Sequence, residues 1–441
     1  MNSQEGKVIF LDSNAVTRIQ SIILIAIVVV AAVVGGYVLM PEESEQRQTI
    51  KIGVCTDLGA GDEGAWKGAV LAAEQINASG GVLGKKIELV SEDSDASSIP
   101  FDPSTVSLAM TNLITYHKVD FIIGGGFTEA NMVFQDIAAE HKMIFIGINS
   151  PGDVLTERVQ NNYEKYKYFF KAGPPSGDVL AAYTRDSFVA LREYTGFNKI
   201  AYVAQDIIWD MYIEKAIEPL SELYGFEIVY GNKFPPERTV DFSSFFAAAE
   251  AAGAEIMIPV MYGVGGISFT KEWYDRQSPM VIWGVNGAAA ADDYWETTDG
   301  KCEYETTTIL PFDAGYPFTS KTVPMREAYK ERWGETPNQL AGIAYDIIRF
   351  ILPDALERAG TLDTEAVIKA LEEVDVETTS MQHFSIYADS HEIMFGPGFG
   401  EQFLVQWQDG ELVPVYPPEI MEEAGATYKF PDWPGPWDNI S

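Results

Sequence analysis

Apolar and polar positions along the chain form two series of short apolar runs, separated by segments with helical spacing. The first series comprises IKIGVC (50–55), KKIELVSE (85–92), VDFIIG (119–124), KMIFIGI (142–148) and KYFFKA (167–172). The second comprises KIAYVA (199–204), FEIVYG (226–231), EIMIPVM (255–261) and MVIWGV (280–285). Runs of this length that alternate with helices predict parallel sheets covered on both faces. Because the series occurs twice, we expect two α/β lobes.

The segments between the runs carry one apolar face. In the segment AWKGAVLAAEQIN, apolar residues recur at the spacing of one helix face that packs against a core. They are Trp66, Ala69, Val70, Ala73 and Ile76. The stretch KAGPPSGD (171–178) separates the two series and is rich in proline and glycine. Such a break predicts that the chain crosses here from one lobe to the other.

The last third of the chain has a different pattern. Two long helices are predicted at 323–334 and 338–360, and a third at 361–374. Pro353 should kink or restart the second helix, because proline has no backbone N–H to donate. The segment FLVQWQDGELVPVY (403–416) has the Asp-Gly pair typical of a β-hairpin turn.

The N-terminal region contains a candidate membrane segment. Residues 21–40 read SIILIAIVVVAAVVGGYVLM and are uncharged, and at roughly 1.5 Å per residue they can cross a ~30 Å hydrocarbon layer. Lys7 and Arg18 precede the segment, so residues 1–20 are predicted to be cytoplasmic and the body, after a linker at 41–49, to lie at the outer face of the cytoplasmic membrane. A cleaved signal peptide is the alternative. The absence of a clear A-x-A site after the apolar run favours a retained anchor.

Charge and cysteine usage exclude several classes of function. The formal net charge of −35 argues against DNA or RNA as a partner, because phosphate backbones are bound by clustered Lys and Arg. Cys55 and Cys302 have no zinc-ligand spacing and indicate no disulfide framework. The sequence therefore predicts no metal site and no nucleic-acid partner.

Catalytic patterns are also missing from the sequence. The four histidines lie in no HExxH or triad-like context, and there is no GxSxG nucleophile elbow. Paired acids such as Asp292 and Asp293 are consecutive and are typical of a solvated surface. We therefore expect no catalytic residues, no cofactor and no enzymatic activity.

The glycine-rich segment FIIGGGFTEAN (121–131) is the most distinctive loop. A phosphate-binding loop requires GxxxxGK[ST], and this segment has Glu129 in place of a lysine. Its glycines instead allow the backbone to approach a small solute closely. Thr128 is expected to cap the following helix, so that its hydroxyl and the first amides face a carboxylate or carbonyl oxygen.

Several segments, in their order along the chain, resemble one family. They are IKIGVCTDLGAGDEGAWKGAVLAAEQINASGGVLGKKIELVSEDSDAS, KVDFIIGGGFTEA, IGINSPGDVLTE, YFFKAGPPSGD, KIAYVAQDIIWD, IPVMYGVGG, VIWGVNG, AYKERWGETPNQLAGIAYD and FLVQWQDGELVPVYPPE. Together they are similar to the type 1 periplasmic solute-binding proteins, the leucine/isoleucine/valine-binding receptors of ABC transporters. The resemblance covers residues 50 to 420. Each segment is weak evidence, and the ordered set is strong evidence.

The resemblance implies a fold and its boundaries. The fold is α/β, with two Rossmann-like lobes of parallel sheets joined by a three-crossing hinge and preceded by the transmembrane helix. Crossings are expected near Gly173, Phe312 and Glu377. They assign residues 50–174 and 315–376 to lobe 1, and residues 178–310 and 380–430 to lobe 2.

The resemblance also implies a solute site in the cleft between the lobes. The positions that match the family's binding residues are Trp66, Gly126, Phe127, Thr128, Asn149, Ser150, Gly152, Trp209, Tyr262 and Asn286. For Trp66, Trp209 and Tyr262 the alternative is plain packing in the core or at the rim. Asn286 stands where amino-acid-binding members have an acid for the ammonium group, and an amide contributes no charge.

Two explanations of Asn286 remain open. Either Glu129, Asp153 or Asp206 supplies the missing charge, or the solute is an amide, a carboxylate or an aromatic acid. The expected function is a receptor that passes a small solute, favoured to be a branched-chain or other neutral amino acid, to the permease and ATPase subunits of an ABC importer. A sensory ectodomain is the alternative from another class, although the 20 residues before Ser21 are too few for a signalling domain.

Overall fold

The computed structural model describes residues 48–58, 63–96, 101–206, 210–235, 241–261, 264–291, 293–309 and 316–440. The predicted membrane segment at 21–40 lies outside these ranges, so it stays a prediction. Within the ranges, no helix is long and apolar enough to span a bilayer.

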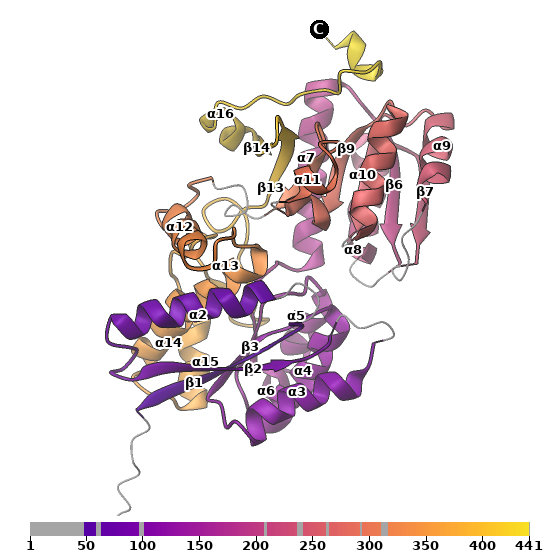
Figure 1. Ribbon diagram of the computed structural model, residues 1–441. Helices are drawn as coiled ribbons and strands as arrows, with labels where there is room; N and C mark the ends of the chain where they lie inside the picture. The colour runs from indigo at the N-terminus through magenta and orange to yellow at the C-terminus, as the bar shows by residue number, and fades with distance from the viewer. Residues whose placement is uncertain are drawn as a thin grey trace, which may run out of the picture. The chain divides into compact units, whose positions relative to one another are not determined.

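The first lobe, whose strands β1, β2 and β3 are labelled in Figure 1, is built on a five-stranded parallel sheet. Its strand order is β2-β1-β3-β4-β5. Its strands are β1 (Thr49–Thr56), β2 (Lys86–Asp93), β3 (Phe121–Gly124), β4 (Phe145–Gly147) and β5 (Phe169–Lys171). Each of the five apolar runs of the first series therefore forms a strand, as predicted.

Helices cover both faces of this sheet. They are α2 (Glu63–Ala78), α3 (Pro103–Thr115), α4 (Thr128–His141), α5 (Asp153–Asn161), α6 (Tyr163–Tyr166), α12 (Thr322–Trp333), α13 (Gln339–Asp346), the π-helix η2 (Ile347–Ile351), α14 (Leu352–Ala359) and α15 (Thr364–Glu372). Side chains of β3 alternate between the two faces: Phe121 and Ile123 belong to the core with α2 and α13 to α15, and Ile122 to the core with α3 and α4.

The second lobe contains a seven-stranded sheet with the order β14-β13-β10-β9-β8-β6-β7. Its strands are β6 (Lys199–Gln205), β7 (Glu227–Phe234), β8 (Ile256–Met261), β9 (Val281–Asn286), β10 (Thr306–Ile309), β13 (Phe403–Gln408) and β14 (Glu411–Tyr416). β6 to β10 are parallel, whereas β13 and β14 are antiparallel. Asp409 and Gly410 form the predicted hairpin turn with φ of 55° and 87°.

The helices of the second lobe bury a second core. They are α7 (Gly177–Thr195), α8 (Asp210–Tyr224), α9 (Ser243–Ala251), α10 (Val264–Arg276), the short η1 (Gly287–Ala290), α11 (Tyr294–Thr297), α16 (Pro418–Glu423) and η3 (Pro436–Asn439). The C-terminal tail adds aromatic residues to this core. Tyr428, Trp433 and Trp437 are buried in it, and Trp433 Nε1 donates to Ser278 O at 2.9 Å.

Pro353 interrupts the long predicted helix, as expected from its missing N–H. The α-helical hydrogen bonding of α13 changes to the π-helix η2 just before the proline, and α14 begins with Pro353 in its first turn. The helix that follows, α15, is capped by Asp363, whose carboxylate accepts from Ala366 N at 3.1 Å.

The three predicted crossings differ in their outcome. The first lies between β5 and α7, and the second, at Phe312, lies outside the described residues. After Glu377 the chain stays with the first lobe. Its β11 (Ile386–Tyr387) and β12 (Glu392–Ile393) form a two-stranded hairpin whose Ile386 and Ile393 join the core of that lobe.

The segment from 381 to 399 therefore differs from the prediction that placed it in lobe 2. Met381 and Phe384 are also buried in the first core, and β13 at Phe403 is the first element of the second sheet to follow. The physical reason is burial of apolar side chains that the sequence analysis had not assigned to either sheet. The remaining domain boundaries stay predictions.

A buried ion pair fastens this hairpin to the first crossing. Lys171, only 1% exposed, has its Nζ 3.4 Å from Glu392 Oε2 and donates to Ser176 Oγ at 2.8 Å. Glu392 also accepts from Ser176 N at 3.1 Å, from the Ser176 hydroxyl, and from Thr156 Oγ1 at 3.1 Å. Burial lowers the pKa of Lys171, against the attraction of Glu392.

Candidate functional site

Several of the predicted solute-binding residues of the first lobe meet at the carboxyl ends of its strands. Thr128 opens α4 after β3, and Ser150 and Gly152 precede α5 after β4. Thr128 Oγ1 lies 2.9 Å from Ser150 Oγ, and both residues are almost fully buried. In open α/β sheets this edge is where ligands bind, so the structure brings these three residues together in a suitable place.

The two glycines of the prediction are required by close packing. A Cβ on Gly126 would lie 2.6 Å from the Cβ of Ala96, and one on Gly152 would lie 2.4 Å from Thr128 Cγ2. Both distances are shorter than a van der Waals contact. Glycine at these positions therefore lets the two loops approach each other and the segment after β2.

Asn131, which the sequence analysis did not select, ties the two loops together. Its Nδ2 donates to Gly126 O at 2.9 Å and to Asn149 O at 3.1 Å. Its Oδ1 is buried without a hydrogen-bond partner in the described part of the chain. The only sequence signal was its spacing, because residue 131 follows Thr128 by one helical turn and so shares its face.

Among the residues that the structure describes, the Thr128 and Ser150 hydroxyls leave one proton uncommitted. Either hydroxyl can donate to the other, and Ser150 Oγ also accepts from Gly152 N at 3.3 Å. The pair has two hydroxyl protons, and the bond between the two oxygens uses one. The loops can therefore offer one O–H donor to a solute oxygen.

Two details of the first-lobe loops differ from the expectation. Phe127, not Thr128, is the N-cap of α4, and no side chain caps the helix. The Thr128 hydroxyl is instead directed to Ser150, because Thr128 is already the first helical residue. Phe127 is 41% exposed, and Trp66 is half-buried against the first core on α2, which leaves its predicted role in binding untested.

In the second lobe, Asn286 does not present its amide at the surface. It is fully buried, and its Nδ2 donates to Glu305 Oε1 at 2.8 Å and to Tyr294 OH at 2.9 Å. Its Oδ1 accepts from Ala288 N at 3.2 Å. Trp209 and Tyr262 lie outside the described residues, so the predictions for them stay open.

The two cysteines and His391 are buried in the described part of the chain. Both cysteines are free and buried, and burial raises the pKa of both thiols, that of Cys302 to about 12. His391 is fully buried, with Nδ1 2.7 Å from Phe169 O and Nε2 3.1 Å from Glu372 Oε1. The described ranges contain no group of three or more His, Cys, Asp and Glu able to hold a metal.

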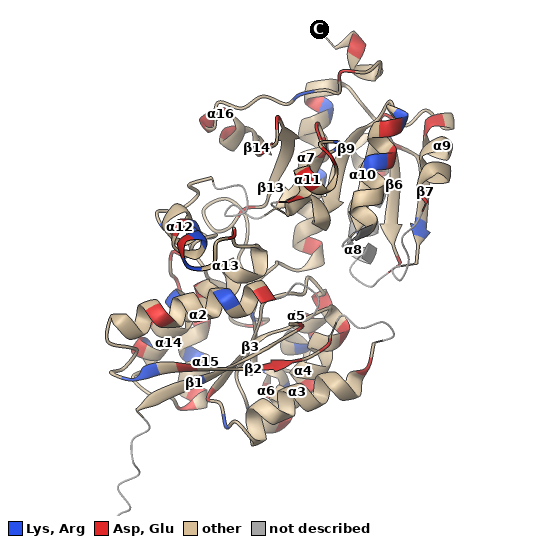
Figure 2. Cartoon of the chain, in the orientation of Figure 1, with Lys and Arg blue, Asp and Glu red and all other residues tan. Residues whose placement is uncertain are grey.

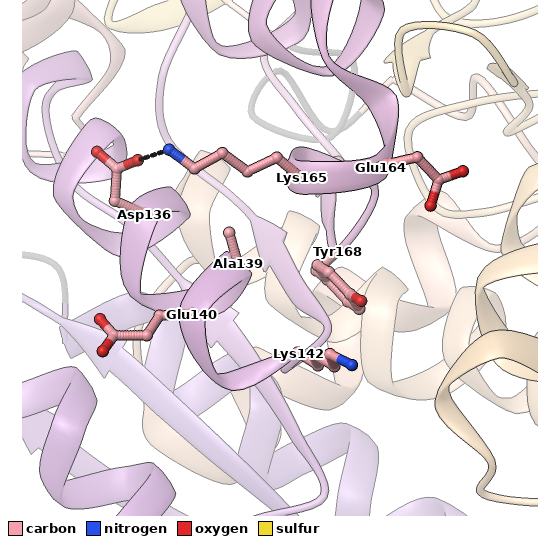
Figure 3. A pocket seen from close by; sticks show the side chains of 7 residues that line it. All are labelled: Asp136, Ala139, Glu140, Lys142, Glu164, Lys165 and Tyr168. Carbon is pink, nitrogen blue, oxygen red and sulfur yellow. Dashed lines mark hydrogen bonds and ion pairs between the residues drawn. The ribbon is translucent and has the colours of Figure 1, made fainter.

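A hollow of about 360 Å³ lies elsewhere on the first lobe, as Figure 3 shows. It is lined by Asp136, Ala139, Glu140, Lys142, Glu164, Lys165 and Tyr168. Lys142 precedes β4 and Tyr168 precedes β5, so the hollow is at the amino ends of these strands, opposite the Thr128 loops. Lys165 Nζ lies 3.3 Å from Asp136 Oδ1. The lining contains both acidic and basic side chains, and none of its residues has a buried side-chain polar atom that lacks a hydrogen bond within the described part of the chain.

Aspartate and glutamate residues occur in elements of both lobes (Figure 2). Their distribution agrees with the interpretation of the net charge of −35 as a repelling, soluble surface.

A family model and curated relatives match most of this chain. A family model described as periplasmic binding protein matches residues 49–411. Leu/Ile/Val-binding protein homolog 7 of Brucella abortus (strain 2308) is 25% identical over 367 residues, which cover 81% of this chain and 87% of the relative.

Solved structures match the fold at low sequence identity. A putative branched-chain amino acid ABC transporter from Silicibacter pomeroyi has a TM-score of 0.75 and 19% identity, covering 87% of this chain and 100% of that one. The substrate binding protein LivJ from Streptococcus pneumoniae, in complex with isoleucine, has a TM-score of 0.67 and 20% identity. The match covers 83% of this chain and 100% of LivJ. An R. palustris solute binding protein in complex with benzoate has a TM-score of 0.66 and 15% identity, covering 83% and 95%.

These matches extend over both lobes, and the family model spans more than four fifths of the chain. Membership implies a location outside the cytoplasm and a role in binding a solute. The chain belongs to the periplasmic binding protein family.

Proposed function

We propose that this protein is the solute-binding receptor of an ABC importer. It holds a small polar solute between its two lobes, which close on the hinge, and it delivers the solute to permease and ATPase subunits. The proposal is supported by the family match, by relatives named Leu/Ile/Val-binding protein homologs, and by structural neighbours named as an ABC transporter and as a transporter substrate binding protein. An anchor at residues 21–40 would keep the receptor at the outer face of the cytoplasmic membrane.

The observation that carries the proposal is the uncommitted hydroxyl proton at Thr128 and Ser150. It lies where α4 and α5 begin, and the first amides of a helix attract negative charge. A carboxylate oxygen of the solute would accept from this hydroxyl and from those amides. Such charge-assisted bonds are stronger than bonds between neutral groups.

The favoured solute is a branched-chain or other neutral amino acid. Curated relatives are named Leu/Ile/Val-binding protein homologs, and one structural neighbour is in complex with isoleucine. The benzoate complex of another neighbour supports simple carboxylates and aromatic acids as the second candidate. Both classes share the carboxylate, so the Thr128 site fits either, and the amino group distinguishes them.

Hinge closure explains how binding would be signalled. Solute in contact with both lobes stabilises the closed form more than the open form, so binding shifts the population towards closure. The permease then recognises the closed form. The buried pair of Lys171 and Glu392 lies beside the first crossing and would keep this part of the hinge in register.

The test is thermal unfolding of the purified protein, freed of carried-over ligand, with L-isoleucine, L-leucine, L-valine, their amides and benzoate. A ligand at ~100 times its dissociation constant adds roughly 2.7 kcal/mol to the free energy of unfolding, which raises the melting temperature visibly. We expect a shift with the amino acids. A shift with benzoate alone would favour the second candidate, and no shift with any compound would count against the receptor.

A matched pair of variants locates the site. Thr128→Val keeps the shape of the side chain and removes the hydroxyl, so we expect solute affinity to fall by about tenfold or more. Thr115→Val removes an exposed hydroxyl that donates to Thr111 O at 2.8 Å, on α3 of the same lobe, and should leave affinity unchanged. Equal affinity in both variants would place the solute elsewhere.

A further inference from the structure

Glu305 is a fully buried acid directly behind Asn286, at the entrance to β10. Its Oε1 accepts from Asn286 Nδ2 at 2.8 Å, and its Oε2 accepts from Thr270 Oγ1 at 2.7 Å. In the described part of the chain no lysine or arginine forms an ion pair with it. The carboxyl is therefore held by hydrogen bonds alone.

The bonds around Glu305 form a closed ring. Tyr294 OH lies 2.6 Å from Thr270 Oγ1 and 2.9 Å from Asn286 Nδ2. The carbonyl of Gly266, in the first turn of α10, is 3.1 Å from Tyr294 OH and 3.0 Å from Thr270 Oγ1. The ring thus joins β9, α10, α11 and β10 at a single point.

The ring lies at the end of the sheet where a solute would bind. Met261, the last residue of β8, pairs with Asn286 at the end of β9. A Cβ on Gly266 would be 2.0 Å from Asn286 Oδ1, so α10 packs directly on the asparagine. The ring therefore contacts the first turn of α10 at the carboxyl end of β9.

Ionisation changes the direction of one bond in the ring. When Glu305 is charged, it accepts from both Thr270 and Asn286, and these charge-assisted bonds are the strong ones. When it is protonated, its proton can go to Thr270 Oγ1, and the Thr270 hydroxyl then turns to Gly266 O. Burial raises the pKa of Glu305 to about 7, although the hydrogen bonds from Thr270, Asn286 and Tyr294 lower it.

The other ionisable groups facing Glu305 do not titrate near neutral pH. They are the Tyr294 phenol on α11 and the Cys302 thiol before β10, and burial raises the pKa of both. The charged residues of α10 are paired outside the ring, as in Lys271 with Asp299 at 3.0 Å and Arg276 with Glu250 at 2.7 Å. Trp407 of β13 contributes only its backbone N–H, which donates to Glu305 O at 3.0 Å.

We propose that Glu305 is a positioning residue of the solute site, whose carboxylate holds Asn286 and the first turn of α10 in the arrangement that receives the amino group of the solute. The inference rests on the proposed receptor function. The inference also explains how Asn286 can replace an acid. The negative charge is on Glu305, whose carboxylate is hydrogen-bonded to the Asn286 amide at 2.8 Å. The buried surroundings have a low dielectric constant, which weakens the field of this charge less than water does. Glu305 touches no solute itself.

The experiment measures the affinity for L-isoleucine and L-leucine by isothermal titration calorimetry between pH 5.5 and 8.5. If only the charged form binds, the competent fraction rises about tenfold from pH 6 to pH 8, and affinity rises with it. Glu305→Gln resembles the protonated form, so we expect affinity at pH 8 to be at least about tenfold weaker than in the wild type and independent of pH.

Glu303→Gln is the matched control, because Glu303 is a half-buried acid two residues away whose Oε2 accepts from Asp409 N at 2.8 Å, outside the ring. The Glu303→Gln variant should show the same rise in amino-acid affinity with pH as the wild type. Thr270→Val removes one donor that lowers the pKa of Glu305, so the midpoint of the affinity profile should move to higher pH. This shift tests the idea independently if Glu305→Gln does not fold.

The outcomes separate the two proposals. Binding that rises with pH in the wild type and is flat in Glu305→Gln supports the inference. Binding with the same pH profile in Glu305→Gln, or an unmoved midpoint in Thr270→Val, overturns it and leaves the receptor function standing. No binding of either amino acid at any pH overturns the amino-acid receptor and this inference with it.

Discussion

The buried pair of Lys171 and Glu392 allows a prediction of stability whose magnitude follows from its contacts. Glu392→Gln removes the only carboxylate within ion-pair distance of the Lys171 ammonium among the described residues, and leaves the ammonium with Ser176 Oγ at 2.8 Å. Breaking a buried ion pair by removing one partner costs about 3–5 kcal/mol. A second argument gives an upper limit in the same range. The variant can avoid a buried unpaired charge by releasing the Lys171 proton, and deprotonating a lysine with an ordinary pKa near 10.4 at pH 7 costs about 5 kcal/mol.

In the Glu392→Gln variant, the free energy of unfolding should depend on pH in a direction that follows from the protonation of Lys171. If Lys171 sheds its proton in the folded variant, the unfolded chain binds one more proton than the folded chain wherever the pH lies between the lowered pKa of the folded state and about 10. The free energy of unfolding then rises with pH by up to about 1.4 kcal/mol per unit. The loss in free energy of unfolding relative to the wild type should therefore be largest at acid pH and become smaller as the pH increases.

Urea-induced unfolding followed by circular dichroism at pH 6.5, 7.5 and 8.5 measures both effects. The control is the double variant Lys171→Met with Glu392→Gln, which removes both charges and should recover part of the lost stability. A loss below about 1 kcal/mol in Glu392→Gln at neutral pH would refute the reasoning, because an exposed pair is worth no more than that. A double variant less stable than Glu392→Gln would contradict it as well.

Three further predictions address other parts of the molecule. Trp433→Ala should lower the free energy of unfolding by about 3–5 kcal/mol in urea, because it empties a buried site of the second core. Asn131→Ala should weaken L-isoleucine binding in calorimetry by about tenfold, because the carbonyls of Gly126 and Asn149 lose the amide that holds both loops. Burial raises the pKa of Asp346 to about 6, so this acid binds protons more tightly in the folded chain. Stability from it is fully present only below pH 4 and falls by about 3 kcal/mol in total as the pH rises from there through 6, whereas Asp346→Asn should lose that slope in melting curves at pH 3 to 8.

The sheets could be predicted because their signal is local. Each apolar run between residues 50 and 285 is short, continuous and bounded by a helix pattern, and each forms one strand of a parallel sheet. The Asp409-Gly410 turn and the break at Pro353 were predictable for the same reason, since turn and helix geometry depend on a few neighbouring residues.

The assignment of residues 381–399 could not be predicted from local pattern. His391 and Glu392 are polar in the sequence and indicate a surface turn, but partners far away in the chain bury them. Ser176, which gives Glu392 its backbone N–H, is 216 residues distant. Contacts at such separation leave no periodicity to detect, and only the assembled first lobe shows why a charged side chain can be buried there.

The position of the first-lobe loops could be predicted, because they combine glycines with small hydroxyl residues at strand ends, and their role in binding a solute stays a prediction. The arrangement of the second-lobe half could not be predicted. Asn286 was selected by resemblance to the family, yet its amide is bound by Glu305, which is 19 residues further on and beside a threonine-rich strand. No spacing rule connects the two, because the contact depends on how α10 and α11 pack.

The two lobes therefore contribute to the proposed recognition in different ways. In the described residues of the first lobe, Thr128 and Ser150 keep one donor uncommitted and Asn131 keeps one acceptor unpaired. In the second lobe, the ring around Glu305 uses the donors of Asn286 internally and offers charge instead of hydrogen bonds. Hydrogen bonds act only at short range, whereas a buried charge acts over several ångströms. This division favours an order of events in which the solute docks first on the loops of the first lobe, and the charge behind Asn286 then draws the second lobe onto its amino group.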